Sequence, residues 1–362
     1  MTPDDDAAAR PRATLAALDR FCRAVLEGAG ADEATSEAAT RAMLHGTRHG
    51  VDSHGVRLLD HYATAMTGGR VNPRPRILVG EGAGGAVASL DADDGHGALA
   101  AYRAMEEAVA RARTFGIGAV GIRRSSHFAP AGAYALAAAE AGCVGLAVCN
   151  SDSFVRLHDG AARFHGTNPI AAAVPVEGGR PWLLDMATSA VPYNRVQLYR
   201  SLGMPVPPAA ASDAEGRDTE DAALAEMLAP LGGAFGFKGA GLGGLVAILR
   251  AVLTGARLDP DIAPMAGPDF ATPRDVGAFV LALRPDAFVT AETMRAAMRR
   301  YLDLLRASPA REGARVMAPG DREWAEAERR EREGVTLDPE TASAFERLAE
   351  RLGVPLPYAD AA

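Results

Sequence analysis

The segment Gly50-Val51-Asp52-Ser53-His54-Gly55-Val56-Arg57 concentrates a hydroxyl, an imidazole, a carboxylate and a guanidinium in one short stretch. A histidine with a pKa near neutrality can give or take a proton. An arginine presents a planar fork of donors that matches a carboxylate. Because His54 and Arg57 are three residues apart, a helical turn would place them on one face. This pattern favours a site for a small 2-oxo or 2-hydroxy acid, although a simple loop with a solvated Arg57 fits the same residues.

Two other kinds of site compete for these residues. Ser53 beside His54 could indicate a hydrolase, but the segment is not G-x-S-x-G and no strand precedes it to form a nucleophile elbow. His45 and His49 have the i, i+4 spacing of a helical metal pair. Arg48 lies between them without the glutamate of H-E-x-x-H, and its positive charge disfavours a divalent ion. The sequence therefore favours neither a serine nucleophile nor a metal site.

The length and composition limit the classes of protein to which this chain can belong. The chain has 362 residues, more than the roughly 250–300 at which a single core stops growing, so two subdomains are expected. A net charge of −8 argues against nucleic acid as a partner. Three cysteines without framework spacing fit a reducing compartment. The acidic start of the chain does not resemble a signal peptide, and the longest apolar run is too short for a bilayer. We therefore expect a soluble, cytoplasmic protein without a membrane partner.

Hydrophobic periodicity predicts the elements that position these groups. Helices are expected over 13–26, 32–44, 58–66, 98–114, 132–141, 219–228, 241–254, 291–307, 322–333 and 339–352. Strands are expected over 77–80, 86–91, 116–122, 144–149, 170–174, 182–185 and 277–283. This mixture predicts an α/β or mixed α+β fold, bracketed by helical N- and C-terminal segments.

Polar residues follow four of the predicted strands. These borders hold hydroxyl, amide, imidazole or carboxylate groups in Arg124–Phe128, Asn150-Ser151, Gly166–Pro169 and Asp185–Ser189. Sites in α/β proteins usually lie at strand ends, so we expect the four borders to form one pocket. Turn chemistry explains any single border, but four together favour a site. Lys238, in a glycine-rich approach to a helix, could meet a cofactor phosphate or ribose, or could simply be solvated.

Two stretches satisfy the dinucleotide pattern G-x-G-x-x-G. Neither has both the preceding strand and the following helix that a dinucleotide-binding turn requires. The first, Gly116–Gly121, follows a helix and is itself a predicted strand. The second, Gly239–Gly244, opens a helix without a buried strand before it. The fingerprint requires a strand, a tight turn and a helix N-terminus together. A nicotinamide cofactor would therefore bind on a scaffold other than the Rossmann turn.

Taken in order, these segments make the chain similar to the malate/L-lactate dehydrogenase type-2 family. The matching motifs are Asp52-Ser53-His54-Gly55 with Tyr62 and Gly69, Ser126-His127-Phe128, Gly166–Ile170, Asp185–Ser189, Pro230–Gly233, Phe237–Leu242, Leu253–Ala256 and Pro319-Gly320. The resemblance implies a non-Rossmann nicotinamide-binding domain with a mixed sheet, here residues 76–286 with a helical insertion at about 190–260. It also implies a helical domain built from residues 1–75 and 287–362, and a homodimer with sites near its interface.

The resemblance also implies roles for individual residues. His54 resembles the proton donor, with Ser53 and Asp185 in a supporting relay. Arg57 resembles the ligand of the substrate carboxylate, and Thr167 a further substrate contact. His127 resembles the histidine beside the nicotinamide, which in some members is the acid/base. Contacts to NAD or NADP are implied for His127, Phe128, Ser151, Asp185, Met186, Ala187, Lys238, Glu312 and Gly313.

Three hypotheses of function follow from the residues and the resemblance. The first is an NAD(P)-dependent oxidoreductase that moves a hydride between nicotinamide and C2 of a small 2-hydroxy or 2-oxo acid. The second keeps this pocket but reduces the C=N bond of a cyclic imino acid, a ketimine. The third is a non-catalytic cofactor-binding relative, in which Asn194-Arg195 replaces the family's usual Gly-Lys pair. The choice between NAD and NADP, and between His54 and His127 as the proton carrier, stays open.

Overall fold

A seven-stranded mixed sheet forms the centre of the computed structural model, which describes residues 10–358. Its strands lie in the order β2-β3-β4-β12-β5-β8-β9. Only β3 and β4 run parallel to each other, and every other neighbouring pair is antiparallel. The strands are β2 (Leu78–Glu81), β3 (Val87–Asp91), β4 (Ile117–Ser125), β5 (Val144–Cys149), β8 (Ile170–Val174), β9 (Trp182–Met186) and β12 (Val276–Leu283).

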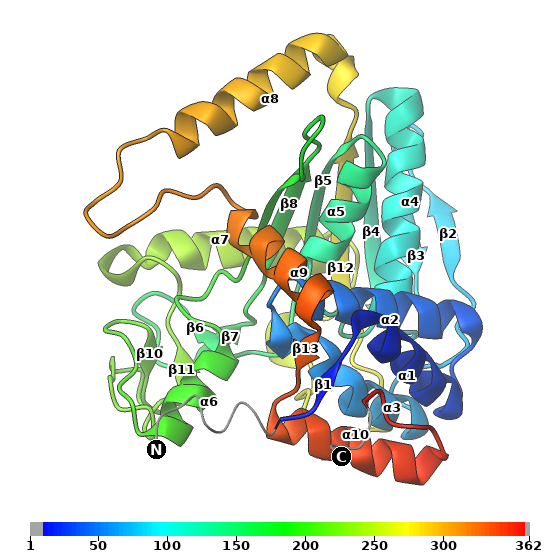
Figure 1. The fold of residues 1–362 in the computed structure, drawn as a ribbon, viewed down its shortest axis with the longest axis vertical. Coiled ribbons are helices and arrows are strands. Elements are labelled where there is room, and N and C mark those ends of the chain that lie inside the picture. Colours follow the sequence, from blue (N-terminus) through cyan, green and yellow to red (C-terminus); the bar gives the residue numbers. More distant parts are fainter. Residues whose placement is uncertain (1–9, 359–362) are drawn as a thin grey trace.

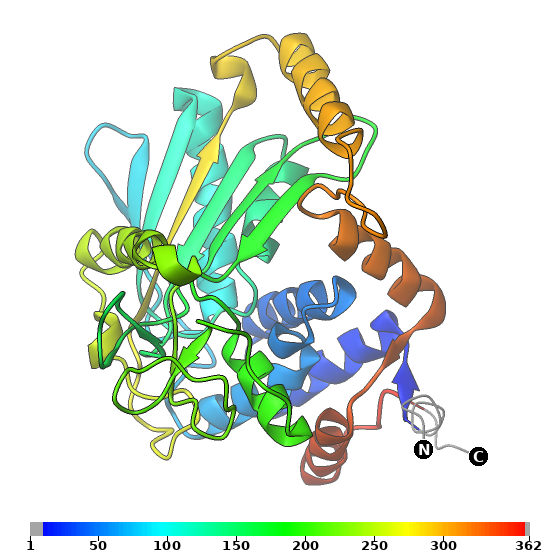
Figure 2. The same cartoon turned by 90° about the vertical axis from the view of Figure 1, so that its left-hand side faces the viewer.

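Helices cover both faces of this sheet (Figures 1 and 2). One face packs against α4 (Gly97–Phe115) and α5 (Gly132–Glu140), and the other against α7 (Phe237–Ala247) and the π-helical turn Ile248–Val252. Glycines in the strands allow this close packing. A Cβ on Gly118 would meet the Ala108 carbonyl of α4, and one on Gly277 would meet the Arg250 carbonyl on the opposite face.

Neither G-x-G-x-x-G stretch forms a turn between a strand and a helix. Gly118 and Gly121 lie inside β4, which ends at Ser125, and Gly239–Gly244 lies within α7. The second stretch is preceded by the 3-10 turn Gly233–Phe235 instead of a strand. The structural context that a Rossmann pyrophosphate turn needs is therefore missing at both positions.

A second apolar core joins the two ends of the chain. It contains side chains of α1 (Leu15–Gly28), α2 (Glu33–Arg48), α3 (Leu59–Thr67) and α10 (Pro339–Leu352). Side chains of Thr14, Asp32 and Asp338 cap the first turns of three of these helices. The strand β1 (Arg12–Ala13) pairs with β13 (Val335–Thr336), so the N- and C-terminal segments lie side by side (Figure 1).

A small third core lies around residues 155–228. It comprises the sheet β10 (Ala211–Ser212), β11 (Met227–Leu228), β6 (Val155–Arg156) and β7 (Arg163–His165), with α6 (Tyr193–Leu202). The helix expected over 219–228 is therefore wrong. Asp221 caps a turn by accepting from the Ala223 N–H, and Glu226 donates its backbone N–H to Ser212. Such local side-chain bonds compete with helix formation.

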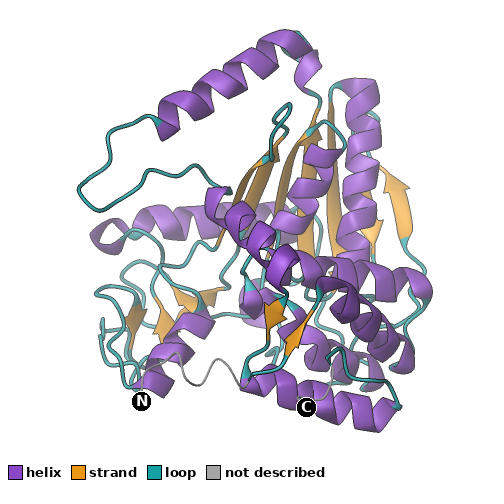
Figure 3. Cartoon of the chain, in the orientation of Figure 1, coloured by secondary structure: helices purple, strands orange, loops and turns teal. Residues whose placement is uncertain are grey.

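Two C-terminal helices lie apart from that core. The helix α8 (Ala291–Arg306) stands away from the body of the molecule, and Leu302 is its only buried residue (Figures 1 and 3). A long connection then leads back to α9 (Asp321–Glu333), which contacts α2. Both helices agree with the predicted ranges, as does α10.

Candidate active site

The segment around His54 forms two short 3-10 turns, Asp52–His54 and Val56–Leu58, separated by Gly55. Gly55 is extended, with φ −92° and ψ −152°. The backbone packs tightly on α2: a Cβ on Gly46 would meet the His54 carbonyl, and one on Gly55 would meet Thr47 Oγ1. Thr47 Oγ1 also accepts a hydrogen bond of 2.9 Å from the Val56 N–H. The sequence of this segment thus fixes His54 against a rigid helix.

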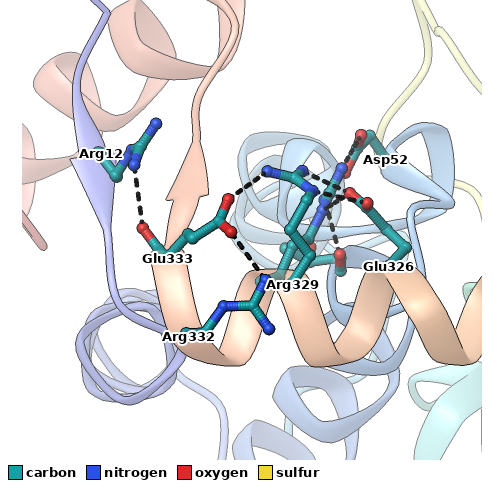
Figure 4. Close-up of polar contacts among 8 residues, drawn as sticks. Arg12, Asp52, Glu326, Arg329, Arg332 and Glu333 are labelled. Atoms are coloured by element: carbon teal, nitrogen blue, oxygen red, sulfur yellow. Dashed lines mark hydrogen bonds and ion pairs between the residues drawn. The ribbon is translucent and has the colours of Figure 1, made fainter.

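Asp52 holds this segment to α9. Arg330 Nη2 donates to Asp52 Oδ2 at 2.9 Å, and Arg330 Nη1 donates to the Thr47 carbonyl at 2.7 Å. Figure 4 shows Asp52 facing α9 beside Glu326 and Arg329. Glu326 bonds both Arg329 and Arg330, so the arginine that holds Asp52 is itself fixed. Asp52 therefore has a positioning role and is not free for chemistry.

The structure does not bring Arg57 to His54. Arg57 Nη1 donates to Asp338 Oδ1 at 2.9 Å, and its Nη2 bonds Glu340. The side chain is 40% exposed and lies against the start of α10. The expected shared helical face of His54 and Arg57 is wrong because the extended Gly55 breaks the helical turn between them. The role of Arg57 as the ligand of the substrate carboxylate stays a prediction, and a substrate would have to compete with Asp338 and Glu340 for its guanidinium.

The structure brings His54 and His127 together, although 73 positions separate them in the sequence. Their rings are stacked with centroids 5.7 Å apart. Ser53 Oγ lies 2.9 Å from His54 Nδ1, and Tyr62 Oη lies 2.7 Å from His127 Nδ1. Each imidazole therefore has a hydroxyl partner that fixes its ring. Tyr62, which sequence reasoning assigned no chemical role, belongs to this site.

The hydrogen bonds determine the tautomer of His127. The backbone N–H of Ala129 points at His127 Nδ1 over 3.3 Å. An N–H can only donate, so Nδ1 is the acceptor and the neutral ring carries its proton on Nε2. Burial lowers the pKa of His127, and His54, His61 and Arg274 lower it further. Burial also lowers the pKa of His54, so both rings are neutral near pH 7.

Asp185 lies near the end of β9 and accepts a 2.7 Å hydrogen bond from the Gly132 N–H at the start of α5. Desolvation by the surrounding protein raises the pKa of Asp185 to about 6, although part of the residue reaches solvent. Across residues 10–358, Asp185 makes no hydrogen bond to Ser53 or His54. Of the implied relay, the contact between Ser53 and His54 is therefore present, whereas Asp185 is not hydrogen-bonded to either residue.

Asp259 organises the loop that carries Thr167. Its carboxylate receives hydrogen bonds from Asn150 Nδ2, the Gly166 N–H and Asn168 Nδ2 at 2.9–3.1 Å. It also forms an ion pair with the fully buried Arg250. Thr167 then donates its N–H to Ser151 Oγ at 3.2 Å, which joins two of the predicted site residues. Sequence reasoning missed Asp259, since Asp259-Pro260-Asp261 has the composition of an ordinary turn.

The other predicted cofactor residues are scattered around this centre. Met186 and Ala187 follow Asp185 directly, and both are partly exposed. The Phe128 ring is buried against Tyr134, so its side chain is a core element. Lys238 is exposed, with Nζ 5.3 Å from the Phe235 ring centroid. Glu312 and Gly313 are exposed on the connection between α8 and α9.

A large cleft of about 1070 Å³ opens between α8, α9 and the start of β9. Gly50 and Val51 line it, so it adjoins the His54 segment. Its charged lining consists of Arg180, Arg195, Arg306, Arg315, Arg322, Arg329, Arg330, Asp321, Glu323, Glu326 and Glu328. The arginines outnumber the carboxylates, which gives the cleft a positive excess. Glu323 also raises the pKa of Asp185, which places that carboxylate close to the same cleft.

Two kinds of feature are missing from the part of the chain that the structure describes. No helix within residues 10–358 is long and apolar enough to cross a membrane. In the same residues, no group of three or more His, Cys, Asp or Glu side chains could hold a metal ion. His45 and His49 lie close, with ring centroids 4.3 Å apart, but no further ligand joins them.

Comparison with known proteins identifies the relatives of this chain. A family model described as malate/L-lactate dehydrogenase matches residues 13–346. A malate dehydrogenase of Pyrococcus abyssi is 32% identical over 346 residues, covering 93% of this chain and 94% of that protein. A (2R)-3-sulfolactate dehydrogenase (NADP(+)) of Chromohalobacter salexigens is 35% identical over 279 residues, covering 76% and 81%.

The fold agrees with these sequence matches. The solved structure of malate dehydrogenase from Pyrococcus horikoshii superposes with a TM-score of 0.87 at 29% identity, covering 96% of this chain and 97% of that one. The mixed α/β architecture is thus shared with this relative. The chain belongs to the malate/L-lactate dehydrogenase family, and it is an oxidoreductase of that family.

Proposed function

We propose that this protein transfers a hydride between a nicotinamide cofactor and C2 of a small 2-hydroxy or 2-oxo acid, with His54 as the acid/base. The observation that carries the proposal is the stacked pair His54 and His127, 5.7 Å apart, each fixed by a hydroxyl. A positioned imidazole can exchange a proton with a substrate oxygen because its pKa lies near the working pH.

The two histidines differ in what they can do. His127 Nδ1 is occupied by the Ala129 N–H and the Tyr62 hydroxyl, so the ring presents only an Nε2–H donor. Within residues 10–358, the one hydrogen-bonding partner of the His54 ring is the Ser53 hydroxyl, which can either give or accept a hydrogen bond. When Ser53 accepts from Nδ1, His54 Nε2 is a free base. His127 then orients the substrate oxygen, and His54 moves the proton.

His54 acts as a base in oxidation and as an acid in reduction. In oxidation, His54 Nε2 takes the hydroxyl proton while the hydride leaves C2, and a carbonyl forms. In reduction, the imidazolium of His54 returns a proton to the oxygen as the hydride reaches C2. The cofactor, when bound, supplies the hydride acceptor or donor. The low pKa of His54 keeps the base form populated near neutrality, which favours oxidation.

The cleft of about 1070 Å³ supports a dinucleotide as the cofactor. Its volume is slightly above the roughly 300–1,000 Å³ typical of ligand pockets. Arginine forks match phosphate oxygens, and Arg195 lines the cleft where the family more often has a lysine. We propose that Arg195 and its arginine neighbours hold the phosphates, with Lys238, Glu312 and Gly313 as further contacts.

The proposal is tested by following NADH and NADPH oxidation with pyruvate, oxaloacetate and a cyclic ketimine carboxylate. Turnover of an oxo acid is expected, and His54→Ala should lower kcat by at least about a hundredfold, the usual contribution of a general acid–base. Turnover of the ketimine alone would favour imine reduction. Stabilisation by a cofactor in a thermal shift assay without any oxidation would favour the non-catalytic relative.

We further propose that α8 buries its apolar side against a second copy of this chain. Phe288, just before α8, is 72% exposed and Leu304 is 63% exposed, while Tyr301 is also exposed. These large apolar side chains lie on or just before one exposed helix, and burying exposed apolar surface is what a protein contact would do. Light scattering should give about twice the chain mass of 37.6 kDa, and Leu304→Glu should shift the protein to monomer. A monomeric wild type would refute this.

A further inference from the structure

Asp259 is a buried carboxylate that joins segments far apart in the sequence. Its side chain is 1% exposed. Five groups lie within hydrogen-bond or ion-pair distance of its two oxygens: Asn150 Nδ2, the Gly166 N–H, Asn168 Nδ2, His165 Nδ1 and Arg250 Nη2. Because an ionised carboxylate has about four acceptor positions, these groups use its full capacity. Asn150 is 109 positions and Asn168 is 91 positions away, so Asp259 fixes contacts that the local sequence does not make.

Two of the joined segments carry residues that we expect to contact the ligands. Asn150 directly precedes Ser151, just after β5, and Asn168 directly follows Thr167. The Thr167 N–H donates to Ser151 Oγ at 3.2 Å, so the two expected contacts are also joined to each other. Asn168 has a φ of +38°, which is uncommon outside glycine. Such a conformation persists where neighbouring contacts fix it, and Asp259 supplies one of these contacts.

The same network reaches two further segments of the candidate site. Asn168 Nδ2 also donates to the Gly243 carbonyl of α7 at 3.1 Å, and α7 is the helix that bears Lys238. The Thr188 N–H donates to the Thr167 carbonyl at 2.9 Å and so ties in the segment that follows β9. The loops expected to hold the ligands are therefore linked through one buried group.

This arrangement leaves two buried amide oxygens unpaired. Asn150 is 3% exposed and Asn168 is 0% exposed, and within residues 10–358 no group donates to the Oδ1 of either. A carboxylate only accepts, so both amides must turn their NH2 groups toward Asp259. Buried polar atoms without a partner are unfavourable and call for an explanation. Holding two loops in one fixed place explains these, whereas a gain in stability does not.

Arg250 balances the charge of Asp259 and is itself held by the sheet. It lies in the π-helical turn Ile248–Val252, and its side chain has no exposed surface. The strand β12 packs directly on this turn, because a Cβ on Gly277 would collide with the Arg250 carbonyl. Turns of this type occur often at functional sites. The sheet therefore fixes Arg250, and Arg250 fixes Asp259.

We propose that Asp259, balanced by Arg250, is a positioning residue of the active centre, which sets the places of Ser151 and Thr167 without touching a ligand itself. This inference rests on the proposed function, because it assumes that these two residues contact cofactor and substrate. Within the described residues, the hydrogen bond of the His54 ring does not involve the Asp259 network. Loss of Asp259 should therefore weaken ligand binding and spare the proton transfer at His54.

Asp259→Asn tests this role, because asparagine keeps the shape but turns an NH2 group toward donors. Hydrogen exchange at the Gly166 and Thr167 amides, measured by NMR without ligand, should become at least about tenfold faster than in the wild type. The dissociation constant of NADH or NADPH and the KM of the acid should each rise at least about tenfold. The kcat and its pH profile should stay within about twofold of the wild type.

A loss of stability alone would give a different result. A smaller folded fraction lowers the apparent kcat and leaves KM unchanged, because the remaining folded molecules are intact. The double variant Arg250→Met/Asp259→Asn also removes the unpaired guanidinium, so it should regain stability but keep the raised KM. It replaces the single variant in every measurement if Asp259→Asn does not fold.

The matched control removes another buried guanidinium and its carboxylate, far from these loops. Arg111 in α4 has a side chain that is 8% exposed and pairs with Glu107 at 2.8 Å. Arg111→Met/Glu107→Gln should bind cofactor and acid within about twofold of the wild type, since it leaves the Asp259 network intact. An equal rise of KM in this control would overturn the positioning role, because any lost ion pair would then have the same effect.

Two further outcomes separate this inference from the proposed function. Wild-type exchange at Gly166 and Thr167, or wild-type cofactor binding and KM in both Asp259 variants, would overturn the positioning role. A wild-type protein that binds NADH or NADPH but turns over no acid would count against the proposed function alone. The exchange rates and the cofactor dissociation constants would still decide the role of Asp259.

Discussion

Replacing Asp185 by asparagine should make the protein more stable at neutral pH. The surroundings of Asp185 raise its pKa to about 6, whereas an unfolded aspartate titrates near 3.9. A carboxyl whose pKa is raised by folding destabilises the native state once both states are ionised, at pH above about 6. This cost disappears as the pH falls from about 6 to about 4, because the native state takes up the proton first.

The size of the effect follows from the two pKa values. A difference of about two pKa units corresponds to about 3 kcal/mol if fully expressed. Asp185 is exposed by its solvent-accessible surface and retains the hydrogen bond from Gly132, so solvent screening reduces this to about 1 kcal/mol. Asparagine is nearly isosteric, and its Oδ1 can still accept from Gly132. The substitution therefore removes the charge and little else.

Urea denaturation followed by circular dichroism between about pH 2 and pH 8 measures this difference and covers the range in which Asp185 and Glu326 titrate. Asp185→Asn should be about 1 kcal/mol more stable than the wild type at pH 7.5 and equal to it near pH 4. Glu326→Gln is a control of opposite sign, because Arg329 and Arg330 lower the pKa of Glu326 to about 2. That variant should be less stable at pH 7.5, with a deficit that shrinks as the pH falls below about 4. A wild type at least as stable as Asp185→Asn at pH 7.5 would refute the reasoning.

Three further substitutions probe the scaffold of the site. Asp259→Asn should lower the free energy of unfolding by about 3–5 kcal/mol, because the buried Arg250 loses its carboxylate; an unchanged urea midpoint would contradict this. Tyr62→Phe should lower kcat about two- to tenfold with little change in KM, since a hydrogen bond of about 0.5–1.5 kcal/mol to His127 is lost. If this variant and the wild type have equal kcat values in steady-state assays, Tyr62 does not belong to the site. Gly55→Ala should lower Tm by several degrees, as its Cβ would meet Thr47 Oγ1; a Tm equal to that of the wild type, measured by calorimetry, would show that the turn tolerates a side chain.

The elements with strong periodicity were predictable from the sequence. Five elements lie within a residue or two of their expected ranges: the helices α8, α9 and α10 and the strands β5 and β12. In each of them the spacing of apolar residues fits only one type of secondary structure. The segment 219–228 was not predictable in this way. Its alanines and leucines favour a helix, but tertiary pairing with β6 and β10 determines its structure.

Some residues of the candidate site were also predictable from the sequence, and others were not. His54 and His127 come from motifs with distinctive spacing, and the fold brings their rings together. Tyr62, which had no predicted role, joins them through its hydroxyl. The position of Arg57 depended on the backbone at one glycine, Gly55, which no side-chain pattern reveals. The place of Asp259 beside the loop that carries Thr167 depends on long-range packing across 91 positions to Asn168. Such contacts appear only after folding.

The placement of α8 has a consequence for how the enzyme responds to dilution. Glu312 and Gly313 lie on the connection between α8 and α9, and Arg306 and Arg315 of the same region line the large cleft. If α8 is held by a second copy, subunit dissociation also releases one wall of the cleft. Cofactor affinity would then depend on protein concentration, and cofactor would in turn favour the assembled form by mass action.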